Sequence, residues 1–183
     1  MLPEIQSDYY KELQRQAWDV ETPVRRDLLR KEVMMIAIDP GASGAIVWYD
    51  ADGIVRACNM PGTYPEIADM LLDLRSKFGY LECVLEKVGT YVPGNSGPAA
   101  AKFARHCGHI EASLYCLGIP TKQVTPSVWQ KKLGALPKDK KARKNKIKEM
   151  MAARYPHLRV TLKNADALGI ITVEMQERRL TEF

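Results

Sequence analysis

The apolar positions from residue 34 onward form short runs first and longer periodic segments later. Three short runs cover Met34 to Ile38, Ala45 to Tyr49 and Ile54 to Met60, with turns rich in Gly and Asp between them. Short apolar runs with such punctuation predict β-strands, here joined as an antiparallel meander. The first three elements are therefore expected to be sequential strands of one sheet.

Longer segments with helical spacing follow this meander. Between Tyr64 and Phe78, apolar residues recur three and four positions apart, which predicts an amphipathic helix. The remaining predicted elements are a strand over 81–85, a helix over 99–117, a strand over 119–124, and helices over 126–133, 147–154 and 165–178.

This order of elements is that of the ribonuclease H-like α/β fold, a mixed five-stranded sheet flanked by helices. We expect that domain over residues 34–183. The first 33 residues have a different composition, because a possible amphipathic segment over 7–20 is followed by a highly charged one over 25–32. They predict a helical and charged N-terminal extension.

Two predicted strands end in a single acid. Asp39 ends the run MMIAID, and Glu86 follows the strand over 81–85. If these strands are neighbours, both acids lie at one edge of the sheet, where a third acid, Asp166, can approach from the last helix. Each acid alone has an ordinary explanation, as a turn former, an exposed strand end or a first-turn helix acid. Their joint placement favours convergence.

Three converging carboxylates repel one another, and desolvating them is costly unless a cation holds them. Convergence of Asp39, Glu86 and Asp166 therefore predicts a site for a divalent metal ion.

The positive charge of the chain is concentrated in one segment. Residues 131–148 hold nine basic residues and one acid, whereas the total formal charge is +5, so the other residues together are negative. Such a concentration is expected of a surface that neutralises phosphates. A solvated helix face or a basic loop without a partner is the alternative explanation.

Composition excludes several other classes of protein. No apolar stretch has the length of a membrane span and the N-terminus lacks the apolar core of a signal peptide, so we expect a soluble, cytoplasmic protein that does not bind membranes. The four cysteines are scattered without a CxxC pair, which argues against a zinc site or a disulfide framework. An actin-like ATPase also begins with a strand, an Asp and glycines, but needs about twice this length.

Several segments together resemble the RuvC family of Holliday-junction resolvases. They extend from about Met34 to Thr172 and comprise IAIDPGASGAIVW, VLEKV, PAAAKFARHCGHIEASL, QVTPSVWQKKLG, RKNKIKEMM and NADALGI. The resemblance implies that Asp39, Glu86 and Asp166 bind two Mg²⁺ ions, or alternatively Mn²⁺, as catalytic acids. It also implies that Lys144 lies near the scissile phosphate or the DNA backbone.

The resemblance further implies that the partners are branched DNA and a second copy of the chain, in a bacterial or phage-infected cell. The helix over 99–117 carries small residues suited either to close approach in a homodimer or to core packing: Ala99, Ala100, Ala101, Ala104 and Gly108. We expect the DNA-binding residues to be Lys131, Lys132, Lys138, Lys140, Lys141, Arg143, Lys144, Lys146 and Tyr91.

The chain departs from the family pattern at two positions. The family has a fourth acid, or a histidine, three residues before the last acid, where this chain has Lys163; Asn164 is the candidate substitute. The family also often places an aromatic wedge three residues after the Glu, where this chain has Gly89. Tyr91 is the nearby aromatic, and it either takes the wedge role or packs on its own loop.

The expected function is that of a metal-dependent, structure-selective DNA endonuclease. It would resolve four-way junctions by paired phosphodiester hydrolysis in recombination, repair or phage-genome processing. The alternatives are a related nuclease acting on flaps, forks or RNA/DNA hybrids, and a junction-binding protein that has lost catalysis, for which Lys163 is the argument.

Overall fold

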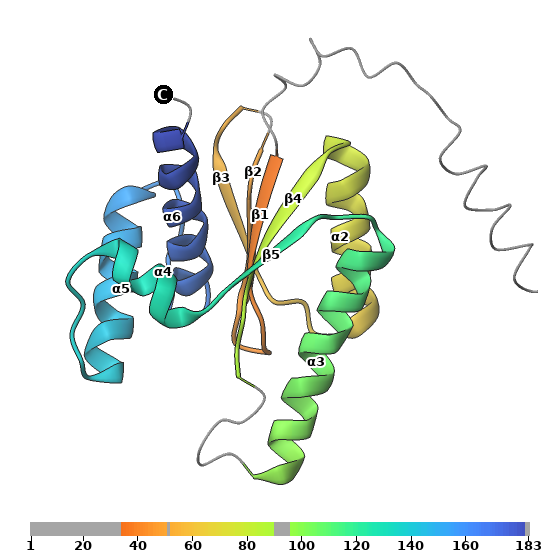
Figure 1. Cartoon of the computed structure of the whole chain (residues 1–183), viewed down its shortest axis with the longest axis horizontal. Helices are drawn as coiled ribbons and strands as arrows, with labels where there is room; N and C mark the ends of the chain where they lie inside the picture. Colours follow the sequence, from red (N-terminus) through yellow and green to blue (C-terminus); the bar gives the residue numbers. More distant parts are fainter. Residues whose placement is uncertain (1–33, 51, 90–95, 182–183) are drawn as a thin grey trace, which may run out of the picture. The chain divides into compact units, whose positions relative to one another are not determined.

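The computed structural model describes residues 34–50, 52–89 and 96–181, as Figure 1 shows. The predicted extension over 1–33 and Tyr91 lie outside the described residues. The strands are β1 (Met34–Asp39), β2 (Ala45–Tyr49), β3 (Val55–Asn59), β4 (Leu81–Glu86) and β5 (Thr121–Val124). The helices are α2 (Tyr64–Phe78), α3 (Gly97–Cys116), α4 (Pro126–Leu133), α5 (Lys140–Arg154) and α6 (Ala165–Thr181). None of these helices is long and apolar enough to cross a membrane.

The five strands form one mixed sheet in the order β3-β2-β1-β4-β5. The predicted meander is confirmed, because β1 pairs antiparallel with β2, and β2 with β3. β1 and β4 are parallel neighbours, with Ile38 opposite Leu85, and β4 pairs in parallel with β5. The carboxyl ends of β1 and β4 therefore meet at the same edge of the sheet.

Side chains of β1 alternate between two separate cores. Met35 and Ala37 pack with α4, α5 and α6, whereas Ile36 and Ile38 pack with α2 and α3. Figure 1 shows these two groups of helices on opposite faces of the sheet. Because side chains of a strand alternate with a period of two, Asp39 continues the series of residues 35 and 37 toward α6.

The N-terminal part of α6 is more deeply buried than its sequence predicts. The pattern indicated one apolar face, but every residue from Ala165 to Glu174 is buried. This part of the helix lies in contact with β1, β2 and β4 on one side and with α4 and α5 on the other. An acid placed in its first turn is therefore held inside the domain.

Helix α5 begins seven residues earlier than predicted. The sequence placed its start at Ile147, after the basic stretch, whereas the helix begins at Lys140. The side chain of Asp139 caps it by accepting a hydrogen bond from the backbone N–H of Ala142 at 2.8 Å. Ile147 and Met151 then anchor the helix in the core. Much of the basic segment is thus a helical surface.

Gly169 allows α4 and α6 to approach closely. A Cβ atom at this position would lie 2.8 Å from Cζ3 of Trp129 and 3.3 Å from Cδ1 of Leu133. We expect Gly169→Ala to lower the free energy of unfolding by about 1–3 kcal/mol, because overpacking displaces a buried ring. Urea denaturation of the metal-free protein measures this.

The matched control is Gly108→Ala on α3, where an added Cβ atom meets nothing within 4 Å. Alanine is the better helix former, so this variant is expected to be more stable by up to about 1 kcal/mol. A loss of stability at Gly108 equal to that at Gly169 would contradict the packing account.

Candidate active site

The three predicted acids come together at one edge of the sheet. Asp39 is the last residue of β1, Glu86 is the last residue of the adjacent parallel strand β4, and Asp166 lies in the first turn of α6. The charges of Glu86 and Asp166 both act on Asp39. Glu86 and Asp166 are buried, at 9% and 8% exposure. The geometry therefore concentrates three carboxyl groups in a largely dry space.

The turn after Asp39 requires glycine at a specific position. The backbone N–H of Gly44 donates to the carbonyl oxygen of Gly41 at 2.9 Å, which closes the turn between β1 and β2. A Cβ atom at Gly44 would lie 1.9 Å from the carbonyl oxygen of Asp39. Only glycine lets the chain reverse directly behind the acid.

Burial and mutual repulsion keep this cluster from being fully ionised. Burial, followed by the charges of Glu86 and Asp166, raises the pKa of Asp39 to about 8 from its ordinary value of 3.8. Burial also raises the pKa of Glu86. The two carboxyl groups are close enough to share a hydrogen bond. At neutral pH, Asp39 therefore holds a proton that it donates to Glu86.

Lys144 supplies a positive charge at the same place. Its Nζ atom lies 3.4 Å from Oδ2 of Asp166, and its charge also acts on Asp39 and Glu86. Lys144 comes from α5, so the earlier start of this helix places the lysine one turn inside a regular element. The sequence-predicted lysine is thus part of the acid cluster.

Trp129 belongs to the site, although no sequence pattern assigned it there. Its indole Nε1–H donates a hydrogen bond of 2.8 Å to Oε1 of Glu86, and the ring is 1% exposed. A buried indole N–H usually needs a hydrogen-bond acceptor, so the sequence predicts that Trp129 has one. It does not identify the residue that accepts. Trp129 therefore fixes the position of Oε1 of Glu86.

Asn164 and Lys163 do not complete the cluster in this structure. Oδ1 of Asn164 accepts hydrogen bonds from the backbone N–H of Thr161 at 2.8 Å and from its hydroxyl at 3.4 Å. Nδ2 of Asn164 donates to the carbonyl oxygen of Arg159 at 3.2 Å. Both ends of the amide thus hold the loop before α6, while Lys163 is exposed. The structure gives Asn164 a role in fixing the start of α6.

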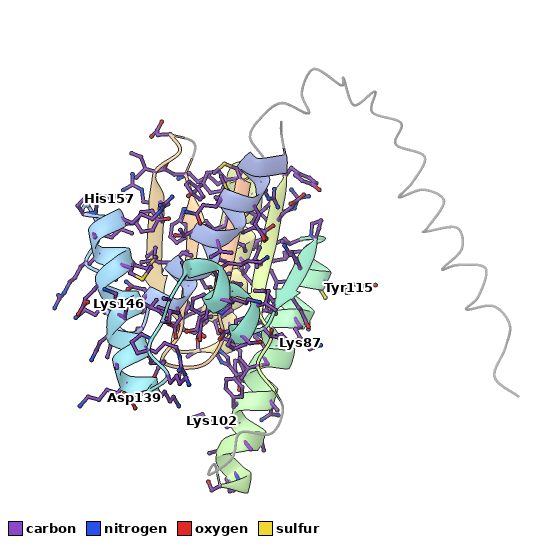
Figure 2. All side chains as sticks on the ribbon, turned by 60° about the vertical axis from the view of Figure 1, so that its left-hand side comes forward. Lys87, Lys102, Tyr115, Asp139, Lys146 and His157 are labelled. Carbon is purple, nitrogen blue, oxygen red and sulfur yellow. The ribbon has the colours of Figure 1, made fainter. Side chains whose placement is uncertain are left out.

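The predicted basic residues lie on α4, on α5 and in the loop between these helices. Lys132 forms a close ion pair with Glu177, and Arg143 donates to the carbonyl oxygen of Lys138 at 2.8 Å, so these two also stabilise the fold. Figure 2 shows Lys146 on α5, and Asp139 at the start of that helix. The predicted residues with exposed side chains are Lys131, Lys132, Lys138, Lys140, Lys141 and Lys146.

The donor set fits a hard divalent cation. Within the described ranges, no three His, Cys, Asp or Glu side chains already converge as a preformed metal cage. Instead, the proton on Asp39 and the ammonium group of Lys144 supply the positive charge that three acids need. Carboxylate oxygens are the ligands that Mg²⁺ and Mn²⁺ prefer, and a bound cation would offset the burial and the repulsion that raise the pKa of Asp39.

Comparison with solved structures identifies the fold. RuvC of Thermus thermophilus in complex with a Holliday junction substrate matches with a TM-score of 0.55 and 16% identity, over 81% of this chain and 96% of that chain. A second Thermus thermophilus RuvC structure matches with a TM-score of 0.51 and 17% identity, over the same shares. The chain therefore has the ribonuclease H-like fold of RuvC. No family model and no curated protein matches the sequence.

The raised pKa of Asp39 predicts how stability depends on pH. Unfolded, this carboxyl group loses its proton near pH 3.8, whereas the folded chain retains it up to about pH 8. The folded state binds more protons between these values, so its stability falls as pH rises from about 4 to 8. Asp39→Asn cannot ionise, and we expect it to exceed the wild type in stability at pH 8 by on the order of 2–4 kcal/mol without metal.

This difference should shrink as the pH falls through 4 and below, where the unfolded wild-type side chain also becomes protonated. Urea titrations in EDTA at several pH values measure it, with Asp73→Asn on the exposed surface of α2 as the control. An Asp39→Asn variant with the same pH dependence as the wild type would contradict the protonated cluster.

Proposed function

We propose that this protein is a metal-dependent endonuclease that cuts branched DNA, with the four-way junction as its substrate. The observation that carries the proposal is the cluster of Asp39, Glu86 and Asp166, with Lys144 at 3.4 Å from Asp166, at the carboxyl edge of a ribonuclease H-like sheet. Clustered acids that cannot all be ionised without a counter-ion favour a cation site. Divalent cations held by carboxylates are a common means of phosphodiester hydrolysis.

The chain's own residues would prepare this chemistry. Asp39, Glu86 and Asp166 would hold the metal ions, which when bound supply an activated water and stabilise charge on the phosphate oxygens. Asp39 would lose its proton to solvent when the ions bind, and Trp129 keeps Glu86 in position through Oε1. Lys144, which pairs with Asp166 here, would then contact a phosphate oxygen.

Branched DNA is proposed as the substrate from charge and fold together. The basic segment lies beside the acid cluster, since Lys144 is itself part of both. On α5, Lys140 and Lys141 lie four and three residues before Lys144, so they extend its face by one turn. Lysine contacts to phosphates give affinity without reading sequence. A solved structure with the same fold is a complex with a Holliday junction.

Symmetric cutting of a junction needs two active sites, so we infer a homodimer. Ala101 and Ala104 are exposed on α3, so packing within their own domain does not account for them. An exposed surface of small side chains lets a second helix approach closely. The proposed setting is the cytoplasm of a bacterium or of a phage-infected cell, in recombination, repair or phage-genome processing.

Cleavage of synthetic DNA tests the activity. We expect paired, symmetric nicks in an immobile four-way junction with Mg²⁺ or Mn²⁺, and none in EDTA, in linear duplex, in a flap or in an RNA/DNA hybrid of equal length. Asp166→Asn should bind the junction and lower the cleavage rate at least about 100-fold, because it removes a metal ligand. Asp73→Asn is the control.

Two results would overturn the proposal in different ways. Cleavage by Asp166→Asn at the wild-type rate would refute the site. Tight junction binding by the wild type without cleavage in either metal would show a junction-binding protein that has lost catalysis, with Lys163 in place of an acid.

The salt dependence of binding tests the basic segment separately. Replacing Lys140, Lys141 and Lys144 together by Gln should flatten the slope of log affinity against log salt by about 2–3 units, because fewer counterions are released. Fluorescence anisotropy with a labelled junction in EDTA measures this. Lys77→Gln on α2 is the control and should leave the slope unchanged; an unchanged slope in the triple variant would exclude the segment from the DNA interface.

A further inference from the structure

A pocket beside the acid cluster is not used by the proposed hydrolysis. It has a volume of about 550 Å³ and lies between the β1–β2 turn, the segment over 60–65 that leads into α2, and the N-terminal half of α3. Figure 2 shows Lys102, at its rim, toward the same end of the domain as Asp139. The pocket residues used below are Gly41, Tyr64, Lys102, Phe103 and His106.

The pocket is lined by aromatic rings from two helices. Tyr64 begins α2, whereas Phe103 and His106 lie on α3, and the ring centroids of Tyr64 and His106 are 6.1 Å apart. Phe103 packs against the backbone of Gly41, where an added Cβ atom would lie 3.2 Å from its ring. Rings held in this way offer flat apolar surfaces, which are suited to a flat aromatic ligand.

The pocket also carries a positive charge among its lining residues. The ammonium group of Lys102 is exposed and offers a contact for an anion. An aromatic ring with an attached phosphate matches both the ring surfaces and this charge.

The pocket lies within reach of DNA held at the acids. Gly41 is two residues after Asp39, so their Cα atoms are at most about 7.6 Å apart. The charge of Asp39 also acts on Cys107, which follows His106 on α3. Successive nucleotides of a stacked strand are about 3.4 Å apart along the helix axis. A base only a few nucleotides from the phosphate at the acids can therefore reach the pocket.

We propose that this pocket receives one unstacked nucleobase of the DNA strand that is held at the acid cluster. The base stacks on Phe103, and Lys102 contacts the adjoining phosphate. Taking a base out of the stack costs least where the duplex is already interrupted, as at a branch point. The pocket would thus help to select branched DNA. This inference rests on the proposed function, because it needs DNA at the acids.

The proposal is tested by removing a nucleobase from the DNA and the aromatic ring of Phe103 from the protein, separately and together. The probes are a set of synthetic four-way junctions, each with one abasic nucleotide at a different position within three nucleotides of the branch point. Binding is measured in EDTA to prevent cleavage. We expect one position at which the abasic junction binds the wild type roughly 5- to 100-fold more weakly than the intact junction. Phe103→Ala should bind the intact junction with a similar loss.

The decisive result is the combination of the two changes. If the base stacks on Phe103, the abasic junction and Phe103→Ala lose no further affinity together, because each removes the same contact. The pocket assignment would be overturned if the two changes together reduced affinity by the product of their separate effects, or if no abasic position weakened binding. Either result would leave cleavage and the acid cluster intact. Failure of the wild type to bind any junction would overturn the proposed function as well.

Two further variants separate stacking from folding. Phe103→Leu keeps apolar volume but has no flat ring, so it should lose affinity like the alanine variant while its thermal unfolding temperature stays near that of the wild type. Tyr80→Ala removes an exposed aromatic ring outside the pocket and should bind both junctions as the wild type does. Wild-type affinity in Phe103→Leu would also contradict base stacking.

Discussion

Three carboxyl groups that repel one another lie together at one edge of the sheet, and the surrounding elements are arranged to hold them there. β1 and β4 are parallel neighbours, so their terminal acids, Asp39 and Glu86, are forced together, and α6 brings Asp166 against them. In water such groups would separate or remain hydrated. Here they are held by a core on each side, and a proton on Asp39 and the ammonium group of Lys144 reduce the repulsion.

The elements packed around the three acids each offset part of the free energy that holding these acids together costs. Helix α6 is buried on all sides over its first turns, which fixes Asp166. Gly169 gives the room that Trp129 needs, and the indole in turn holds Glu86. Helix α5 supplies Lys144 and exposes further lysines next to it. The same packing that stabilises the domain therefore holds the acids together, as the proposed cation site requires, and keeps them next to the lysines of α5.

Most of the fold could be predicted because its elements are defined by local patterns. Strand alternation and turn residues predicted β1, β2 and β3, and helical spacing predicted the bounds of α2. The three acids could be predicted as a group because each ends or begins an element whose neighbour follows from the topology. The predicted start of α5 was wrong, because a highly basic stretch resembles a loop in sequence. The structure shows that Asp139 caps the helix there.

Other features of the site depend on contacts between residues far apart in sequence. Nothing near Trp129 indicates that its N–H meets Glu86, 43 residues away. Asn164 has a side chain suited to a metal, but the loop before α6 already uses both ends of its amide. The pocket at Phe103 arises only when α3 packs beside the turn after Asp39. Such features arise from tertiary packing, and no periodic pattern in the sequence predicts them.

We infer that a bound cation would replace the proton of Asp39. Calorimetry of Mg²⁺ binding at pH 7 in buffers of different ionisation enthalpy tests this, because it counts the protons released. We expect release of about one proton per chain, since the pKa of Asp39 is about 8, and no such release from Asp39→Asn. Mg²⁺ binding without proton release, or with equal release from both proteins, would contradict it.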